Sequence, residues 1–423
     1  QVAFLQVLGA NKTLTGDRRA FLGRNGSPMA PSALALDDLD GRTGAGLDPC
    51  GAIQTRMTVA PATTEEIIFL LGAGETREEA NGLLAKYADP GAVTSEIKRA
   101  VQSWQEVLGS LQVKTPNRAM DIMVNGWLQY QTLSCRVWGR SAFYQSGGAF
   151  GFRDQLQDVM AIVHTRPDLT REQILRAAAR QFKEGDVQHW WHPPGGKGTR
   201  TRFSDDFLFL PYVPDFYLRA TGDTSILNVE VPFVASPPLH DQEQERYEQP
   251  HSTSETASLY DHCLRALQHG LRYGAHGLPL MGCGDWNDGM NKVGEGGQGE
   301  SVWVAFFQIV VFEHFSQWMR LRHDHANAEK YVAEAQRLRS AVEEHAWDGQ
   351  WYRRAFFDDG TPLGSHVNEE CRIDSLAQSW SVIAGADPQR AEQAMKCATA
   401  QLVRDQDGLI MLFTPPFDQG DLN

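Results

Sequence analysis

The chain has 423 residues, of which 42% are hydrophobic and 22% are charged, and its formal net charge is −14. This composition excludes a mainly disordered chain. The length exceeds one ordinary core, so we expect a large domain with a smaller one beside it in the sequence. The acidic balance, without any run rich in Lys and Arg, argues against nucleic acid and anionic membrane surfaces as partners.

The six cysteines are scattered along the chain, without a CxxC pair or a regular spacing. This pattern argues against a disulfide framework and against a zinc site, so no metal is expected, and it fits a reducing compartment. No apolar run reaches the ~18–20 residues needed to span a bilayer, and no signal-peptide pattern opens the chain. We therefore expect a cytoplasmic protein. The abrupt start and end of the sequence suggest a piece of a longer one.

Residues 1–75 have the pattern of β structure. The expected strands, each bounded by turn residues, are Val2–Val7, Arg19–Leu22, Ala52–Val59 and Glu66–Leu71. So few strands cannot close a sandwich, so this region predicts part of a larger β-sandwich domain. Residues 76–114 change to helical spacing, with helices expected over Arg77–Tyr87 and Val93–Leu108, and they predict a helical linker.

Residues 115–423 are predicted to be mainly α-helical. The expected helices are Arg118–Val137, Gln155–His164, Arg171–Gln181, Asp206–Thr221, Thr256–Tyr273, Ser301–His323, Ala326–Ala346, Ser375–Ile383 and Pro388–Val403. The loops between them are long and rich in Gly, Pro, Trp, His and Asp, notably at Gln188–Asp205 and Leu278–Gly299. Helical hairpins with such loops predict an (α/α)6 toroid. The helices are too few to complete it, so we expect a catalytic domain that is incomplete at its C-terminus.

The segment Gly282–Gly289 is the most informative part of the chain. It places Asp285, Trp286, Asn287 and Asp288 between small residues, which would form a poor helix or strand. Two acids three residues apart, with an indole between them, suit a site that protonates a leaving oxygen while a ring shields the sugar. The segment therefore predicts carbohydrate chemistry.

Two other segments carry candidate ligands. In Gly147–Asp158, glycines allow close backbone approach and Asp154 either caps the following helix or accepts hydrogen bonds from sugar hydroxyls. In His189–Gly196, the spacing of His189 and His192 fixes no helical metal geometry, so these residues are expected to bind hydroxyls or brace loops. Trp190 and Trp191 remain either stacking rings or core residues. A further polar segment, Ser365–Asp374, is either a site rim or the cap of the helix that follows.

Several reaction types remain open from the residues alone. A glycosidase needs a second carboxylate, either as nucleophile or as base, whereas an inverting phosphorylase needs one acid and cations for phosphate. Arg136, Arg140 and Arg153 lie close in sequence to the Gly-rich turn. Taken singly, each of them fits a surface residue or a salt-bridge partner better than a phosphate ligand.

Taken together, these motifs resemble glycoside hydrolase family 94, the inverting cellobiose, chitobiose and β-1,2-oligoglucan phosphorylases. The likeness is strongest to the phosphorylase-like C-terminal region of cyclic β-1,2-glucan synthases. The matching strings, which cover residues 115–420 in order, are Trp127–Leu133, Arg140–Gly147, Gly151–Asp154, Trp190–Pro193, Ser204–Asp206 and Asp285–Asp288.

The resemblance implies roles for individual residues. Asp288 falls on the family's general acid and Arg140 on a phosphate-contacting arginine, while Asp285 would orient the loop. The residues implied in substrate binding are Asp154, Arg153, Trp286, Asn287, His192 and Asp206. Inorganic phosphate would be a co-substrate, no cofactor is implied, and the product would be an α-sugar 1-phosphate formed with inversion.

The sequence also departs from the family pattern. The Gly-rich turn carries Gly147-Gly148-Ala149 where cellobiose-acting members have an arginine, which favours the β-1,2-glucan branch. The family's further phosphate-site segments, with a His and a Thr-Gly pair, have no match before Asn423. We expect phosphorolysis of β-1,2-linked glucans, with a glucan oligosaccharide and phosphate as partners. A homodimer, as in relatives, or membership of a larger membrane-associated synthase would fit. The alternatives are an inverting β-glucan hydrolase and a non-catalytic glucan-binding module.

Overall fold

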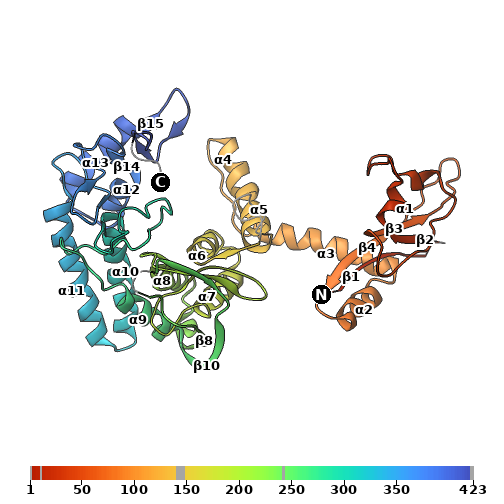
Figure 1. Ribbon diagram of the computed structural model, residues 1–423, viewed down its shortest axis with the longest axis horizontal. Coiled ribbons are helices and arrows are strands. Elements are labelled where there is room, and N and C mark those ends of the chain that lie inside the picture. The colour runs from red at the N-terminus through yellow and green to blue at the C-terminus, as the bar shows by residue number, and fades with distance from the viewer. Residues whose placement is uncertain (1, 10–11, 140–147, 241–242, 420–423) are drawn as a thin grey trace. The chain divides into compact units, whose positions relative to one another are not determined.

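The structure is a computed structural model that describes residues 2–9, 12–139, 148–240 and 243–419. The chain divides into two compact units, residues 1–107 and 108–423. Figure 1 shows the first as a small β-rich body and the second as a larger helical one. All six cysteines are free. Within the described ranges, no helix is long and apolar enough to cross a membrane.

The first unit contains two antiparallel strand pairs. Strand β1 (Val2–Val7) pairs with β4 (Phe69–Gly74), and β2 (Lys12–Asp17) pairs with β3 (Pro49–Thr55). The strand expected at Arg19–Leu22 is wrong, because these residues form helix α1 (Arg18–Leu22). The Asp17 carboxylate accepts a hydrogen bond from Arg19 N and so starts the helix. Strand β2, which is too polar to be recognised from its pattern, was not expected.

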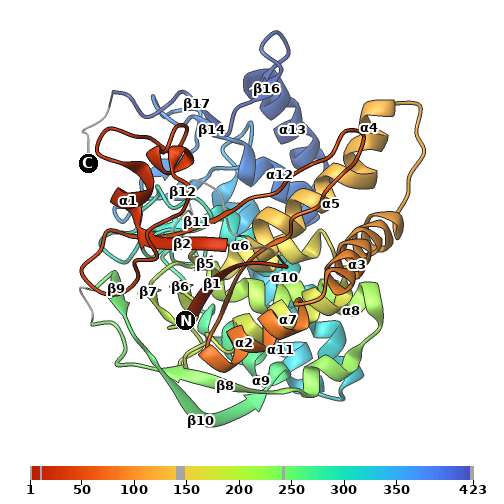
Figure 2. The ribbon, with the colours of Figure 1, turned by 90° about the vertical axis from the view of Figure 1, so that its right-hand side faces the viewer.

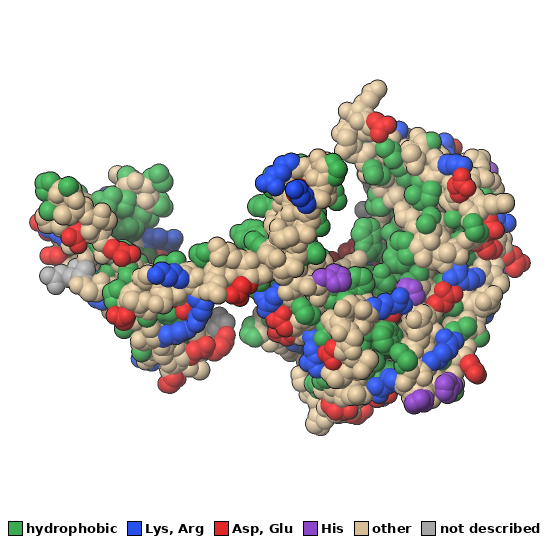
Figure 3. Space-filling model, turned by 180° about the vertical axis from the view of Figure 1, so that it is seen from behind, with side chains coloured by type: hydrophobic (Ala, Val, Ile, Leu, Met, Phe, Trp, Pro, Cys, Tyr) green, Lys and Arg blue, Asp and Glu red, His purple; other side chains and the backbone are tan. Residues whose placement is uncertain are grey.

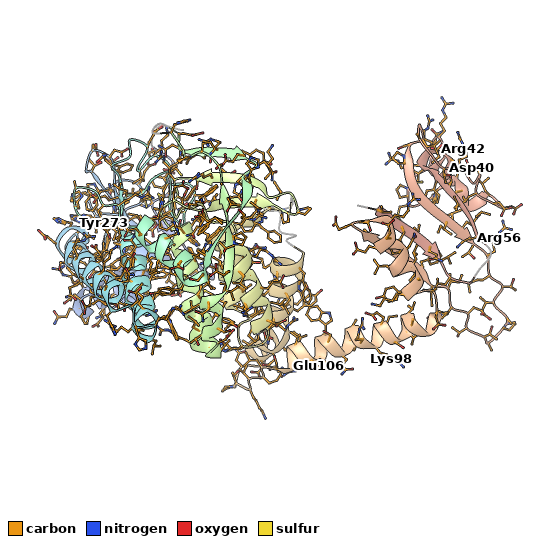
Figure 4. The ribbon with its side chains drawn as sticks, turned by 90° about the horizontal axis from the view of Figure 1, so that it is seen from below. Asp40, Arg42, Arg56, Lys98, Glu106 and Tyr273 are labelled. Atoms are coloured by element: carbon orange, nitrogen blue, oxygen red, sulfur yellow. The ribbon has the colours of Figure 1, made fainter. Side chains whose placement is uncertain are left out.

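Two helices complete the first unit and lead out of it. Helix α2 (Arg77–Lys86) begins at Thr76, whose hydroxyl accepts from Glu79 N, while Glu79 Oε2 accepts from Glu75 N. Helix α3 spans Pro90–Gly109. Both helices expected in this region are therefore confirmed. Figure 4 shows Lys98 and Glu106 on α3, and Asp40, Arg42 and Arg56 on the strand-bearing part of the unit.

The second unit begins with a helical run over residues 118–138. It comprises α4 (Arg118–Ile122), a π-helical segment, α5 (Leu128–Gln131) and a second π-helical segment ending at Trp138. Large apolar side chains on this run are exposed, including Met120, Trp127 and Trp138. Figure 3 shows apolar side chains on the helix and in the hollow beside it.

The other helices of the second unit match eight of the expected segments, with shifted ends. They are α6 (Phe152–Met160), α7 (Pro167–Ala178), α8 (Phe209–Thr221), α9 (Leu259–His269), α10 (Val302–Leu321), α11 (His325–Ala341, continued by a π-helical turn to Ala346), α12 (Ser375–Ile383) and α13 (Pro388–Leu402). Consecutive helices pack in pairs, α6 on α7, α10 on α11 and α12 on α13. Helix α10 also packs against α8 and α12, and it is buried along most of its length, which places it in the core.

The prediction of a loop over Gln188–Asp205 is partly wrong, because this segment contains two strands. Strands β5 (Phe150–Gly151), β6 (Gln188–His192), β7 (Lys197–Thr201) and β9 (Glu245–Glu248) form an antiparallel sheet in that order. They lie in a row in Figure 2. A second pair, β8 (Glu230–Ala235) with β10 (His251–Ser258), was also not expected. Because β10 runs to Ser258 and Ser258 caps α9, that helix begins later than expected.

Short strands connect the last helices. Strands β11 (Glu300–Ser301), β12 (Ala355–Phe356) and β13 (Pro362–Leu363) form one sheet, and β14 (Ile373–Asp374) pairs with β17 (Phe413–Thr414). Strands β15 (Val403–Arg404) and β16 (Leu409–Ile410) form a hairpin. An apolar cluster beneath these strands includes Met281, Met290 and Ala355. The loop that contains Asp288 therefore rests on a packed base.

Candidate active site

Arg153, in the first turn of α6, is the centre of the candidate site. Its Nη1 donates to both carboxylate oxygens of Asp205, at 2.9 Å each, and to the Asp285 carbonyl oxygen at 2.8 Å. Its Nη2 donates to Asp288 Oδ1, and its Nε lies 3.8 Å from Asp206 Oδ1. Arg153 is only 5% exposed, so one buried guanidinium gathers three carboxylates from two distant segments.

The three carboxylates around Arg153 differ in their exposure to solvent. The side chain of Asp288 is 65% exposed, whereas those of Asp205 and Asp206 are buried. Asp288 is therefore the member of the cluster that can reach a ligand, while the other two hold Arg153 in place.

The cluster carries more carboxylates than cations, and this imbalance affects protonation. Complete burial raises the pKa of Asp205 to about 8, with Asp206 and Asp285 adding to the effect and Arg153 opposing it. Burial of His189 lowers its pKa, but the Asp206 carboxylate raises it by more, so the pKa lies above its usual value. Burial lowers the pKa of Arg153, but the surrounding carboxylates together raise it by more than burial lowers it, so the pKa lies above its usual value. Arg153 is therefore always charged.

A second buried arginine holds the other acid of the loop. Both Asp285 and Arg354 are inaccessible to solvent; Arg354 Nη1 donates to Asp285 Oδ2 at 2.7 Å and Nη2 to Oδ1 at 2.5 Å. Ser301 Oγ, at the start of α10, also donates to Asp285 Oδ2 at 2.7 Å. Burial raises the pKa of Asp285, but Arg354 and Ser301 lower it by more, so it is an ionised anchor.

Glycines explain why this sequence can form the loop. Gly282 has φ of 62° and Gly284 has φ of 156°. A Cβ at Gly282 would lie 1.9 Å from the Arg202 carbonyl oxygen, and one at Gly284 would lie 2.7 Å from the Phe203 ring. The loop thus passes against the segment that carries Asp205, and Ser204 N donates to Gly284 O at 3.0 Å.

Trp286 and Asn287 lie between the two acids. Trp286 is 39% exposed, so its ring is available on the same stretch of backbone as Asp288. Asn287 N donates to Asp285 Oδ1 at 3.2 Å, and its side-chain oxygen accepts from Gly289 N at 3.1 Å. In this arrangement the Asn287 side-chain oxygen supports the turn that presents Asp288.

The two histidines of the predicted site are placed differently. His189 Nδ1 lies 2.7 Å from Asp206 Oδ2, and its ring stacks on Phe203 with centroids 4.4 Å apart. His192, at the end of β6, packs edge-on against Trp190 with centroids 5.3 Å apart. The structure therefore brings His189, which was expected to bind hydroxyls or brace a loop, into the Arg153 cluster through Asp206. Trp191 is a core residue at 1% exposure.

The remaining predicted residues lie near the start of α6 or outside the described part. Asp154 follows Arg153 in the first turn, and its carboxylate lies over Gly151, where an added Cβ would be 1.9 Å from Oδ2. Arg136 Nε donates to both oxygens of Asp158 at 3.0 Å. Arg140 lies outside the described residues. In the described ranges, no cluster of three or more His, Cys, Asp or Glu could hold a metal ion.

The segment Ser365–Asp374 supports the same anchor. Asp374 Oδ1 accepts from Leu376 N at 2.7 Å and caps α12, while its Oδ2 lies 3.5 Å from Arg354 Nε. Arg354 could not be predicted from the sequence, because nothing in its sequence neighbourhood marks it as buried or paired. Asp205 could have been found, since it stands beside the predicted Asp206.

A family model for the glycosyl hydrolase 94 superfamily catalytic domain matches residues 103–423. The chain belongs to the glycosyl hydrolase 94 superfamily. The supersandwich domain of the same family matches residues 1–90. The catalytic match includes Arg153, Asp205, Asp288 and Arg354.

Several relatives within glycosyl hydrolase 94 can be compared along the chain. The cyclic beta-(1,2)-glucan synthase NdvB of Rhizobium meliloti (strain 1021) is 44% identical, over 96% of this chain and 14% of the relative. The N,N'-diacetylchitobiose phosphorylase of Vibrio furnissii is 30% identical, over 90% of this chain and 48% of the relative. The solabiose phosphorylase of Paenibacillus borealis is 28% identical, over 95% of this chain and 49% of the relative. The chain thus spans half or less of the length of these relatives.

Proposed function

We propose that the chain carries the acid-catalytic part of an inverting glycoside phosphorylase acting on β-1,2-linked glucose chains. The observation that carries the proposal is the arrangement at Asp288. An exposed carboxylate is held by buried Arg153 beside the exposed ring of Trp286, within a glycosyl hydrolase 94 catalytic domain. The relatives support the reaction class, since several are phosphorylases, and the glucan synthase at 44% identity supports the β-1,2 linkage.

The proposed reaction is reversible phosphorolysis. Asp288 gives its proton to the glycosidic oxygen as the bond to the anomeric carbon breaks, and a phosphate oxygen forms the new bond from the opposite face. The products are α-D-glucose 1-phosphate and a chain shortened by one glucose.

The other proposed ligands surround this acid. Trp286 and Asp154 would line the subsite of the transferred glucose, with Asn287, His192 and Asp206 as further substrate contacts or supports. Arg140 would bind phosphate. Arg153 has its donors turned to Asp205, Asp285 and Asp288, so we propose that it acts on substrate through Asp288. No cofactor takes part in this proposal.

The same proposal includes the architecture and the setting of the domain. The paired helices support an (α/α)6 toroid over residues 115–423, preceded by a partial sandwich at 1–75 and a linker at 76–114. The free thiols support a reducing, cytoplasmic compartment. We propose control of chain length within a larger synthase as the setting, and the 44% identity to a cyclic beta-(1,2)-glucan synthase, of which the chain matches 14%, supports membership of such a synthase.

The test is incubation with β-1,2-glucooligosaccharides, with and without inorganic phosphate, followed by assay of α-D-glucose 1-phosphate. We expect release only with phosphate, and its loss in Asp288→Asn while oligosaccharide binding is kept. Equal release of free sugar with or without phosphate would instead identify a hydrolase. Binding without turnover in the unaltered protein would identify a glucan-binding module.

A further inference from the structure

A cavity of about 380 Å³ lies beside the loop that carries Asp288. Its walls include Arg202, Arg272, Gly282 and the glycine-rich segment 294–297. None of Arg153, Asp154 or the segment Asp285–Asp288 lines it. The cavity is therefore separate from the candidate active site, although both use the same loop.

Arg202, which follows β7, is held by backbone carbonyls. Its Nε donates to Glu243 O at 2.8 Å, and its Nη2 donates to His240 O at 2.8 Å and to Leu239 O at 3.4 Å. These neutral acceptors fix the guanidinium but do not neutralise it. Within the described residues, its Nη1 has no hydrogen-bond acceptor.

Arg272 lies at the end of the α9 region and faces the same cavity. Its Nε donates to His269 O at 3.1 Å, and within the described ranges neither Nη atom has an acceptor. Burial lowers the pKa of Arg272, Asp186 opposes this, and the charge of Arg202 lowers it further. The neighbouring Tyr273, which is labelled in Figure 4, is fixed on α11. Its hydroxyl donates to Glu334, and Arg337 covers its ring.

The acids nearest to the two arginines are committed to other cations. Asp186 accepts from Arg200 Nε at 2.7 Å and from Nη2 at 2.8 Å. Glu295, which also lines the cavity, accepts from Lys292 at 3.2 and 3.1 Å. Two arginines thus face one cavity, and the carboxylates of Asp186 and Glu295 are hydrogen-bonded to Arg200 and Lys292 and to neither of these arginines. Such an arrangement is suited to an anion.

The glycine wall of the cavity is fixed before any ligand binds. Asp358 accepts from Gly296 N at 2.6 Å, from Gln298 N at 2.7 Å and from Gly299 N at 2.8 Å. A Cβ at Gly294 would lie 2.7 Å from the Gly282 carbonyl oxygen, so the wall also packs closely on the Asp288 loop. A rigid wall lowers the entropy cost of binding.

We propose that this cavity binds an anionic sugar, with the phosphate or carboxylate group on Arg202 and Arg272 and the sugar against the glycine wall. The volume lies within the range of about 300–1,000 Å³ found for small-molecule sites, and it exceeds what inorganic phosphate would fill. A sugar phosphate and a sugar acid share the required chemistry. The proposal does not depend on the proposed phosphorolysis, because no residue of the candidate active site contributes to it.

The test is calorimetric titration of the chain at low salt with D-glucose 6-phosphate, D-glucuronate, D-glucose and inorganic phosphate. We expect saturable binding of one or both anionic sugars, and the comparison between them shows whether the ligand carries a phosphate or a carboxylate group. Binding of D-glucose and of inorganic phosphate should be at least tenfold weaker. Arg272→Gln should weaken binding of the anionic sugar by tenfold or more. The matched control is Arg320→Gln, an exposed arginine on α10 that lines none of the described cavities, and it should bind as the unaltered chain does.

Trp286→Ala separates this site from the candidate active site, because the Trp286 ring is proposed to line the glucose subsite and does not line the cavity. This variant should bind the anionic sugar as the unaltered protein does, and loss of binding in it would place the ligand in the active site and overturn the proposal. Unchanged binding in Arg272→Gln, or binding of neither anionic sugar, would also overturn it. Inorganic phosphate binding as tightly as D-glucose 6-phosphate would make this a small-anion site and overturn the sugar part. Failure of phosphorolysis would leave all these measurements interpretable.

Discussion

At the scale of single residues, Arg153 determines where Asp288 stands. Arg153 is 5% exposed, and its guanidinium contacts Asp205, Asp288 and the Asp285 carbonyl group. Replacing it by Met would leave buried carboxylates without a partner, so we expect Arg153→Met to lower the free energy of unfolding by about 3–5 kcal/mol. Urea denaturation would measure this. Arg171→Met is the control, because its pair with Asp223 is partly exposed and should contribute less than about 1 kcal/mol.

Asp205 gives the site a pH dependence whose sign can be worked out. Its pKa of about 8 in the folded protein exceeds the value of about 3.9 expected in the unfolded chain. The folded state therefore binds the proton more tightly, and this stabilisation is lost as the pH rises towards and through about 8. His189, with a raised pKa, acts in the same direction, whereas Asp285, with a lowered pKa, matters only under acidic conditions.

We therefore expect Asp205→Asn to reduce the loss of stability between about pH 6 and about pH 9. The asparagine keeps one oxygen for Arg153 but has no proton to lose. Urea denaturation at several pH values would measure the slope, with exposed Asp405→Asn as the control. A slope in Asp205→Asn equal to that of the unaltered protein would show that another group carries the dependence.

At the scale of elements, the Asp288 loop is fixed by strands and helix starts that follow it in the sequence. Arg354 precedes β12, Ser301 begins α10, and Asp374 caps α12; the first two bind Asp285, and Asp374 faces Arg354. We expect Arg354→Lys to increase amide hydrogen exchange over residues 282–290, because a single ammonium cannot replace the bidentate pair. The proposed phosphorolysis should fall in kcat more than it changes in KM, since Asp288 would be misplaced rather than lost.

The adjacent Arg353→Lys is the matched control for that experiment. Arg353 donates to the His345 carbonyl group and does not contact Asp285. A loss of thermal stability in Arg354→Lys with unchanged exchange in the loop and unchanged kcat would mean that the pair supports the fold without positioning Asp288.

The sequence predicted some of these elements well and others poorly, for physical reasons. Amphipathic helices such as α9 were found because apolar periodicity is local. Strand β6 was missed because Trp, His and Pro in a Gly-rich segment give no clear alternation, although its pairing with β5 and β7 decides its state. The segment Asp285–Asp288 could be recognised from its composition, whereas Arg354 could not, because its role depends on a contact between residues 69 positions apart.

At the scale of the whole molecule, every group shown to hold Asp288 belongs to the second unit. Arg153, Asp205, Ser301 and Arg354 all lie within residues 108–423, while residues 1–107 form a unit with its own strand pairs and helices. We therefore expect the two units to unfold as separate cooperative transitions. Differential scanning calorimetry of the whole chain should resolve them.

Ala80→Asp would identify the transition of the first unit. Ala80 is 2% exposed on α2, so a buried carboxylate there should lower the midpoint of that transition alone. Ala85→Asp, at an exposed position on the same helix, is the control and should leave both midpoints nearly unchanged. The pH dependence assigned to Asp205 should persist in Ala80→Asp, since it belongs to the second unit. Equal shifts of both midpoints would instead show that the chain unfolds as one cooperative body, and the stability changes expected for Arg153 would then apply to the whole chain.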